Sequence, residues 1–209
     1  MLGLSVTRTA NAGVLLEMDG KRILIDGICK PYKPYQGTPT YLKNELSENL
    51  PDVLAFTHEH LDHYDSAYAK LYKEKTLRSI IGPESLNFYK LGNGVELKSV
   101  STRHIGKTDV LHVSFVIKGS STVWFMGDAT PISLKSMTDM DKPDLLILPF
   151  AYAITNSAWR QVKETGAKKV LLVHMPLKSD DEVGLWAMVE NTVVAGELIY
   201  LEVGEKIEL

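Results

Sequence analysis

The stretch "VLAFTHEHLDHYD", Val53 to Asp65, places three histidines and two aspartates within the eight residues from His58 to Asp65, directly behind an apolar run. The whole chain has only six histidines. Neutral imidazole and carboxylate groups are ligands that zinc, iron and manganese accept. A polar loop with exposed histidines would also explain one such motif, so the prediction of a metal site depends on the rest of the chain.

Other potential ligands follow three later apolar runs. His104 comes after "VELKSVSTR", Asp128 after "TVWFMG" and His174 after "KKVLLV". Functional groups in α/β proteins gather beyond the carboxyl ends of strands. Four strand ends therefore present candidate ligands to one side of a sheet. His112 is set apart, because it lies inside "DVLHVSFVI", where we expect a strand residue that faces polar surface or is hydrogen-bonded in the core.

The pattern of apolar segments predicts a layered α/β fold. Two apolar segments flank Asp19 and Gly20, a dipeptide that accepts the positive φ angles of a tight hairpin turn. From residue 52 onward, short apolar runs alternate with amphipathic segments, which is typical of α/β architecture. Three consecutive strands are predicted at residues 95–103, 109–119 and 122–127, which favours mixed sheets.

Helices are expected in several of the amphipathic segments. Pro83 suits the first turn of a helix over residues 83–91. Ser179 and Glu182 form a capping-box pattern for another helix over residues 180–191. Two further helices are predicted at residues 66–74 and 156–166.

Length and composition narrow the class of protein. The 209 residues, of which 44% are hydrophobic and 23% charged, predict a single globular domain over residues 1–209. A net charge of −3 gives no general attraction to nucleic acid or to anionic membranes, so neither is an expected partner. The single cysteine, Cys29, excludes an intrachain disulfide and is expected to be a small buried residue. The N-terminal segment lacks the layout of a signal peptide, and we expect a cytoplasmic protein.

On these motifs the sequence resembles the metallo-β-lactamase superfamily. The signature His-x-His-x-Asp-His of that family stands here as His58, His60, Asp62 and His63, and later counterparts are His104, Asp128 in "FMGDAT" and His174 in "LLVHMP". The resemblance implies an α/β fold, a four-layer αβ/βα sandwich with two mixed sheets. It also implies that "RILIDG" ends in a supporting aspartate, Asp26, which fixes a histidine tautomer or a loop.

Within the superfamily the chain is similar to a compact branch that includes the L-ascorbate-6-phosphate lactonase. Many members of that branch carry a Gly-His pair near their start, whereas this chain has Asn11 and Ala12 in "TANAGVLLE".

The resemblance implies a role for each candidate ligand. His58, His60 and His104 would hold the first metal, Asp62, His63 and His174 the second, and Asp128 would bridge them. The expected metals are two Zn2+ per chain, with Mn2+ or iron able to substitute. Two metals about 3.5–4 Å apart can share a hydroxide and stabilise the charge of the transition state. Asp62 would also be catalytic, because a carboxylate beside the hydroxide can orient it and accept its proton.

The predicted function is a metal-dependent hydrolase of a small ester, lactone or phosphoester. An anionic substrate is expected to meet Arg103, Lys107 or Asn156, the nearest candidates by sequence. Tyr32 and Tyr35 either line the mouth of the site or are merely exposed. Two alternatives stay open: a non-catalytic metal- or ligand-binding protein, and an iron-dependent redox enzyme of the same fold. The family's iron redox members replace the second signature histidine with glutamate, whereas this chain has His60. The expected partner is a small molecule, and a homo-oligomer is left open.

Overall fold

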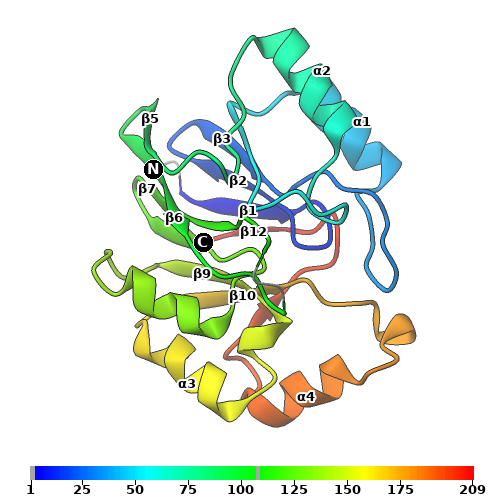
Figure 1. Ribbon diagram of the computed structural model, residues 1–209, viewed down its shortest axis with the longest axis vertical. Coiled ribbons are helices and arrows are strands. Elements are labelled where there is room, and N and C mark those ends of the chain that lie inside the picture. Colours follow the sequence, from blue (N-terminus) through cyan, green and yellow to red (C-terminus); the bar gives the residue numbers. More distant parts are fainter. Residues whose placement is uncertain (1–2, 107–108) are drawn as a thin grey trace.

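Two β-sheets pack face to face in the computed structural model, which describes residues 3–106 and 109–209, and helices cover the outer face of each sheet (Figure 1). Both sheets contain parallel and antiparallel pairs. The predicted four-layer αβ/βα sandwich with two mixed sheets is therefore confirmed. None of the helices within the described ranges has the length and apolarity that a membrane span requires.

The first sheet has five strands in the order β12-β1-β2-β3-β4. Among its strands in the described part of the chain, only β3 and β4 pair in parallel. Asp19 and Gly20 form the turn between β2 and β3 with φ of 52° and 75°, as the sequence predicts. Its strands are β1 (Ser5–Arg8), β2 (Val14–Met18), β3 (Lys21–Ile25), β4 (Val53–Ala55) and β12 (Lys206–Glu208). Helices α1 (Thr40–Glu48) and α2 (Ser66–Thr76) cover its outer face.

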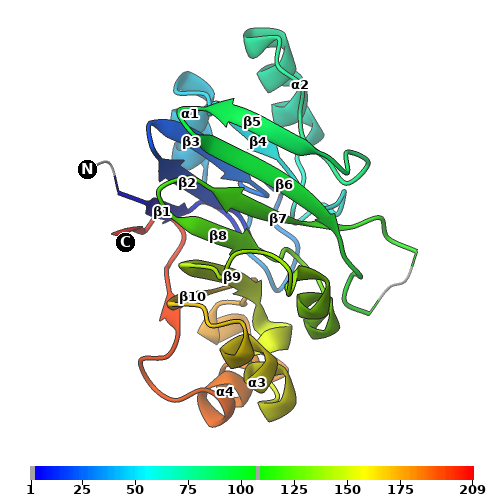
Figure 2. The ribbon, with the colours of Figure 1, turned by 90° about the vertical axis from the view of Figure 1, so that its left-hand side faces the viewer.

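The second sheet has seven strands in the order β11-β10-β9-β8-β7-β6-β5 (Figure 2). Neighbours from β8 to β11 are parallel and the others antiparallel. The strands are β5 (Phe88–Gly92), β6 (Val95–Ser101), β7 (Val113–Lys118), β8 (Thr122–Phe125), β9 (Leu145–Pro149), β10 (Lys169–Val173) and β11 (Ile199–Tyr200). The covering helices are α3 (Asn156–Glu164) and α4 (Leu185–Thr192), with 3-10 turns η1 (Pro131–Met137), η2 (Phe150–Tyr152) and η3 (Lys178–Asp180).

The alternation of side chains along the strands builds three apolar layers. Leu16 and Phe115 belong to the layer between the two sheets. Tyr72 of α2 belongs to the layer under the first sheet, and Trp124 of β8 and Trp159 of α3 belong to the layer under the second. Both faces of the central strands are therefore buried, which explains why runs such as residues 145–149 are apolar throughout.

The helix predicted at residues 83–91 is wrong. Residues Phe88–Gly92 form the edge strand β5, and Pro83 lies in a turn. Asn93 and Gly94, with φ of 53° and 78°, form the tight turn into β6. An Asn-Gly pair favours this hairpin strongly, and pairing with β6 outweighs the local helix pattern.

The predicted capping box of Ser179 and Glu182 is also wrong, because α4 begins only at Leu185. The carboxylate of Asp181 instead accepts the backbone N–H groups of Leu185 and Trp186, at 2.9 and 2.8 Å. Gly184, with φ of 75°, lets the chain turn into the helix one residue before it starts. The predictions at residues 66–74 and 156–166 are confirmed by α2 and α3.

Candidate metal centre

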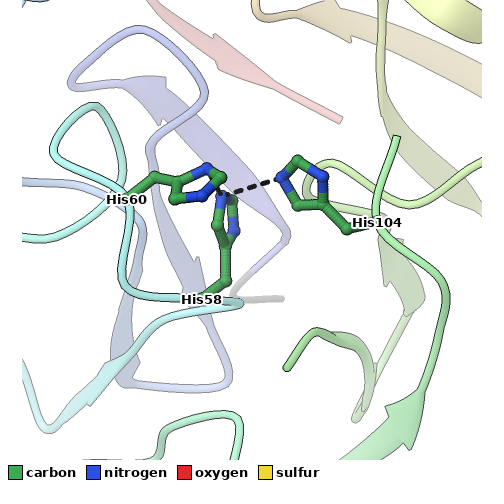
Figure 3. A group of neighbouring side chains, drawn as sticks. All are labelled: His58, His60 and His104. Carbon is green, nitrogen blue, oxygen red and sulfur yellow. Dashed lines mark hydrogen bonds between the residues drawn. The ribbon is translucent and has the colours of Figure 1, made fainter. Parts of the chain in front are cut away.

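Loops that follow four strands meet at one end of the two sheets and carry the candidate ligands. The first group comes from the loop after β4 and from His104 after β6, and its rings converge in Figure 3. His58 Nε2 lies 3.0 Å from His60 Nδ1 and 3.3 Å from His104 Nε2. Three ring nitrogens that face one point can hold one metal ion.

A second group lies beside the first. His174 Nε2 is 3.2 Å from Asp62 Oδ2, and His63 Nε2 is 3.7 Å from the same oxygen. All three side chains are buried, and their donor atoms lie within 4.8 Å of one another. Two nitrogens and one carboxylate oxygen form a second set suited to a divalent cation.

Asp128, after β8, faces both groups through one oxygen. Its Oδ2 lies 3.4 Å from His63 Nε2 and 3.3 Å from His174 Nε2 in the second group. The same oxygen lies 3.7 Å from His104 Nε2 in the first group. The structure thus brings all seven side chains that the sequence singled out into one cluster, with Asp128 between its halves.

Hydrogen bonds behind the cluster set the direction of two rings. Asp26 accepts the backbone N–H of Thr57 at 2.8 Å, the Thr57 hydroxyl at 2.7 Å and His63 Nδ1–H at 2.8 Å. Since the Thr57 hydroxyl donates its one proton to Asp26, it accepts from His58 Nδ1–H at 3.0 Å. In both rings the proton on Nδ1 leaves Nε2 as the nitrogen that faces the cluster, and this is the atom that would bind a metal ion.

His104 is oriented in the same way by the backbone. Its Nδ1 lies 2.6 Å from the carbonyl oxygen of Ile105, which can only accept. The proton therefore resides on Nδ1, and the unprotonated Nε2, which faces His58, is the atom that can bind a metal ion.

The cluster contains buried polar atoms without hydrogen bonds. These atoms are His63 Nε2, both ring nitrogens of His174, and Asp128 Oδ1. Unpaired buried polar atoms are costly, and two of these, His63 Nε2 and His174 Nε2, face the same oxygen of Asp128, as the donor atoms of a ligand site do. The cluster as a whole offers five histidines and two aspartates, a set of ligands that suits divalent cations.

Burial and mutual charge shift the pKa values of the cluster. Burial lowers the pKa of His58 far below its usual range, so its ring is neutral at physiological pH. Burial also acts to lower the pKa of His174, but Asp128 and Asp62 outweigh it and raise this pKa to about 9. Histidines His174 and His63 in turn hold the pKa of Asp128 well below its usual range despite its burial. A cation bound here would replace protons that the carboxylates attract, which couples metal affinity to pH.

His112 takes a position that the sequence did not reveal. It lies just before β7, fully buried, and its Nδ1 is 2.8 Å from the Thr102 hydroxyl. Its Nε2 accepts the backbone N–H of Asp128 at 3.0 Å. The expectation that His112 is hydrogen-bonded in the core is confirmed, and its partner is the backbone of a candidate ligand.

Asn11 also contacts the cluster, although sequence reasoning gave it no role. The Asn11 side-chain amide donates to Asp62 Oδ2 at 3.2 Å, and its backbone oxygen accepts the N–H of His174 at 3.1 Å. Arg8 donates to the same backbone oxygen at 3.1 Å and holds the turn in place. The only signal in the sequence was that Asn11 follows another strand that ends on this side of the fold.

A cavity of about 400 Å³ opens over both groups. Its apolar walls come from residues far apart in the chain, namely Tyr32, Tyr35, Leu61, Ile105 and Phe150. The edge of the Tyr35 ring packs against His174 with 4.2 Å between ring centroids. Both tyrosines of the proline-rich loop thus line the mouth of the site.

The residues expected to meet an anionic group lie elsewhere. Arg103 lines a neighbouring cavity, and Asn156 begins α3 without reaching the cavity over the cluster. The expectation is therefore wrong for these two, and Lys107 lies outside the described residues. Cys29 is buried as predicted, and burial raises the pKa of its thiol.

Comparison with known proteins agrees with this fold. A sequence model described as a beta-lactamase superfamily domain matches residues 5–171. The chain belongs to this superfamily. A search of curated proteins finds no match to this chain.

Solved structures share the fold of this beta-lactamase superfamily domain. It is similar to a "possible metal-dependent hydrolase" from Veillonella parvula DSM 2008, with a TM-score of 0.74 and 16% identity over 100% of both chains. It is similar to isothiocyanate hydrolase from Delia radicum gut bacteria, with a TM-score of 0.65 and 15% identity over 98% of this chain and 99% of that one. It also resembles CmlA, a diiron beta-hydroxylase from Streptomyces venezuelae, with a TM-score of 0.62 and 14% identity over 100% of this chain and 55% of that one. At these identities the likeness concerns the fold and leaves the reaction open.

Proposed function

We propose that the protein is a metal-dependent hydrolase of a small ester, lactone or phosphoester. The observation that carries this proposal is the position of Asp128 Oδ2, within 3.3 to 3.7 Å of histidine nitrogens from both ligand groups. One carboxylate between two sets of donors is the arrangement that a pair of metal ions requires. The cavity of about 400 Å³ over these donors is large enough for a small molecule.

Seven side chains would hold two ions in this proposal. The first ion would lie among His58, His60 and His104, the second among Asp62, His63 and His174, and Asp128 would contact both. Zinc is the preferred metal because imidazole and carboxylate donors suit it, and manganese or iron can use the same donors. When bound, such ions polarise a carbonyl or phosphoryl oxygen and make water more acidic.

The protein's own groups would then position the reactants. Asp62 lies on the cavity wall, where it would orient the attacking water and accept one of its protons. Asn11 holds Asp62 Oδ2 at 3.2 Å and so fixes the direction of the carboxylate. For an ester, the water oxygen bonds to the carbonyl carbon, the bond to the leaving oxygen breaks, and the proton held by Asp62 passes to that oxygen. The products are a carboxylic acid and an alcohol.

The narrower resemblance to the L-ascorbate-6-phosphate lactonase group makes lactones sensible first substrates, and it stays part of this proposal. The two alternatives are outcomes of the same experiment. A protein that binds metal without turnover would be a binding protein, and one that retains iron and reacts with oxygen would be a redox enzyme. A cytoplasmic location is part of the same proposal.

The test is a metal and activity assay on protein purified without chelator. Elemental analysis should give about two divalent ions per chain, and titration of the metal-free protein should saturate near two equivalents. A panel of lactones, simple esters, phosphodiesters and a β-lactam is then assayed with metal present. Saturation at one equivalent would contradict the two-metal arrangement, and no turnover on the whole panel would contradict the hydrolase.

A further inference from the structure

The walls of the cavity over the metal cluster are mainly aromatic and aliphatic. Tyr35, Ile105 and Phe150 form its sides, and Tyr32 and Leu61 stand at its rim. The two rim residues are 56% and 57% exposed, so their apolar side chains are accessible to a ligand that enters the cavity. Exposed apolar residues that rim a concave site are typical of ligand-binding grooves.

Charged groups in the same cavity are all acidic or metal-binding. Among the described residues that line it, none is lysine or arginine, and the carboxylates are Asp62 and Asp128. Asp26 lies directly behind, 2.8 Å from His63 Nδ1. These three carboxylates would offset most of the charge of two divalent ions. Phosphate recognition uses arginine, lysine or clustered backbone N–H groups, and the described part of this cavity offers no such cation.

The tyrosine wall is held in place before any ligand arrives. Tyr32 and Tyr35 exchange backbone hydrogen bonds of 3.1 and 2.8 Å, so the loop between them forms a closed turn. The base of the loop is closed by Thr38, whose N–H donates to the Cys29 oxygen at 3.1 Å and whose hydroxyl accepts the Cys29 N–H at 3.0 Å. Lys30 N–H donates to the Leu61 oxygen at 3.2 Å, which ties this loop to the loop that carries the metal cluster. A preformed wall costs little ordering entropy when a substrate binds.

We propose that the substrate is a neutral ester or lactone with an aromatic or branched apolar body, which packs against Tyr35 and Phe150 and against the rim residues Tyr32 and Leu61. This inference rests on the proposed hydrolase function and narrows its substrate class. The apolar body lies on the described walls, and the scissile carbonyl points to the ligand groups at the floor. A phosphoester would place its charge beside Asp62 and Asp128 without a described cation to balance it.

The experiment compares matched substrates on the metal-loaded protein. We expect kcat/KM for phenyl butanoate to exceed that for phenyl acetate by about tenfold, because two added methylene groups are buried. Bis(4-nitrophenyl) phosphate should be the poorest substrate of the set. Faster turnover of the phosphodiester, or no gain from the longer acyl chain, would overturn the inference while the hydrolase proposal stands.

Binding without turnover separates this inference from the proposed function. N-phenylbutanamide and N-phenylacetamide carry the same phenyl and acyl groups as the two esters. Calorimetry should show about tenfold tighter binding of the longer amide. Equal binding or no binding would overturn the inference, whatever the activity assays give. Absent turnover with preferential binding of the longer amide would contradict only the hydrolase.

Two rim variants and one control locate the effect. Leu61→Ala and Tyr32→Ala should weaken binding of the longer amide several-fold and leave the metal content unchanged, because both side chains are exposed at the rim. Leu86→Ala is the matched control, since Leu86 is 59% exposed and does not line this cavity. Unchanged binding in both rim variants would contradict the proposed contact surface.

Discussion

His112 holds the backbone of Asp128, because its Nε2 accepts the Asp128 N–H at 3.0 Å. The other ring nitrogen lies 2.8 Å from the Thr102 hydroxyl, so both nitrogens have partners. Burial lowers the pKa of His112 to about 3, and the ring is neutral and able to accept at physiological pH. The one histidine outside the ligand cluster therefore fixes the residue that lies between its two halves.

We expect His112→Ala to lower both stability and metal affinity. The change leaves the buried N–H of Asp128 without a partner, at a cost of about 1–3 kcal/mol, and loosens a ligand, which typically costs about 10–100-fold in affinity. Denaturant unfolding and metal titration would measure the two effects. The conservative variant His112→Asn, which keeps an amide oxygen, should recover part of the loss. An Ala variant with parental affinity would show that His112 has only a packing role.

Asp128→Ala should reduce the metal content from about two ions to one or none per chain and abolish hydrolysis. The reason is that Asp128 Oδ2 lies within reach of nitrogens in both groups. His60→Ala should weaken mainly the first ion, because His60 belongs only to the first group. Elemental analysis after dialysis gives the readout, and Asp139→Ala, which alters an exposed aspartate, serves as the control. Two tightly held ions in Asp128→Ala would refute the bridging assignment.

Asp26→Asn should lower metal affinity by about 10–100-fold without unfolding the protein. Asp26 accepts from Thr57 and from His63 Nδ1, and an amide NH2 cannot replace the accepting oxygen that both share. Asparagine tolerates the positive φ of 49° at this position, so the backbone is not strained. Asp19→Asn is a matched control, because Asp19 also has a positive φ, of 52°, but lies in the β2–β3 turn. Equal metal affinity in the two variants would argue against a role for Asp26.

Asp65 makes the stability of the protein depend on pH. Its carboxylate caps α2 through the N–H groups of Ala67 and Tyr68 and lies 2.7 Å from Lys43 Nζ. Burial acts to raise the pKa of Asp65, but Lys43 and the Tyr68 N–H outweigh it and hold this pKa below its usual value. The stabilisation is therefore complete above the unfolded pKa of about 3.9 and is lost as pH falls through the lower folded pKa.

Two substitutions at Asp65 separate charge from capping. Asp65→Ala should cost about 1–2 kcal/mol at neutral pH, because it removes the cap as well as the ion pair. Asp65→Asn keeps a capping oxygen, so it should cost less and flatten the dependence on pH below about 4. Unfolding by urea at several pH values measures both. A parental acid profile in Asp65→Asn would mean that other carboxylates dominate the acid sensitivity.

The fold was largely predictable where the apolar pattern is unambiguous. The Asp19-Gly20 hairpin and the buried strands were predicted correctly because both depend on short-range properties of the chain. The segment from Pro83 to Leu91 was not, because its spacing also suits a helix and only pairing with β6 decides for a strand. The start of α4 was missed for a similar reason, since Asp181 rather than Ser179 meets the free N–H groups.

The sequence by itself determined the types of the cluster residues, their order along the chain and their placement after strands, because strand ends can be read from local apolar runs. Only the tertiary structure decided which ring nitrogen faces the cluster, that His112 and Asn11 support Asp128 and Asp62, and that the described walls of the cavity are largely apolar. These features depend on partners far apart in the chain, such as Asp26 and His63 or Tyr35 and His174. Local periodicity carries no information about such pairs, since their contacts exist only once the two sheets have packed together.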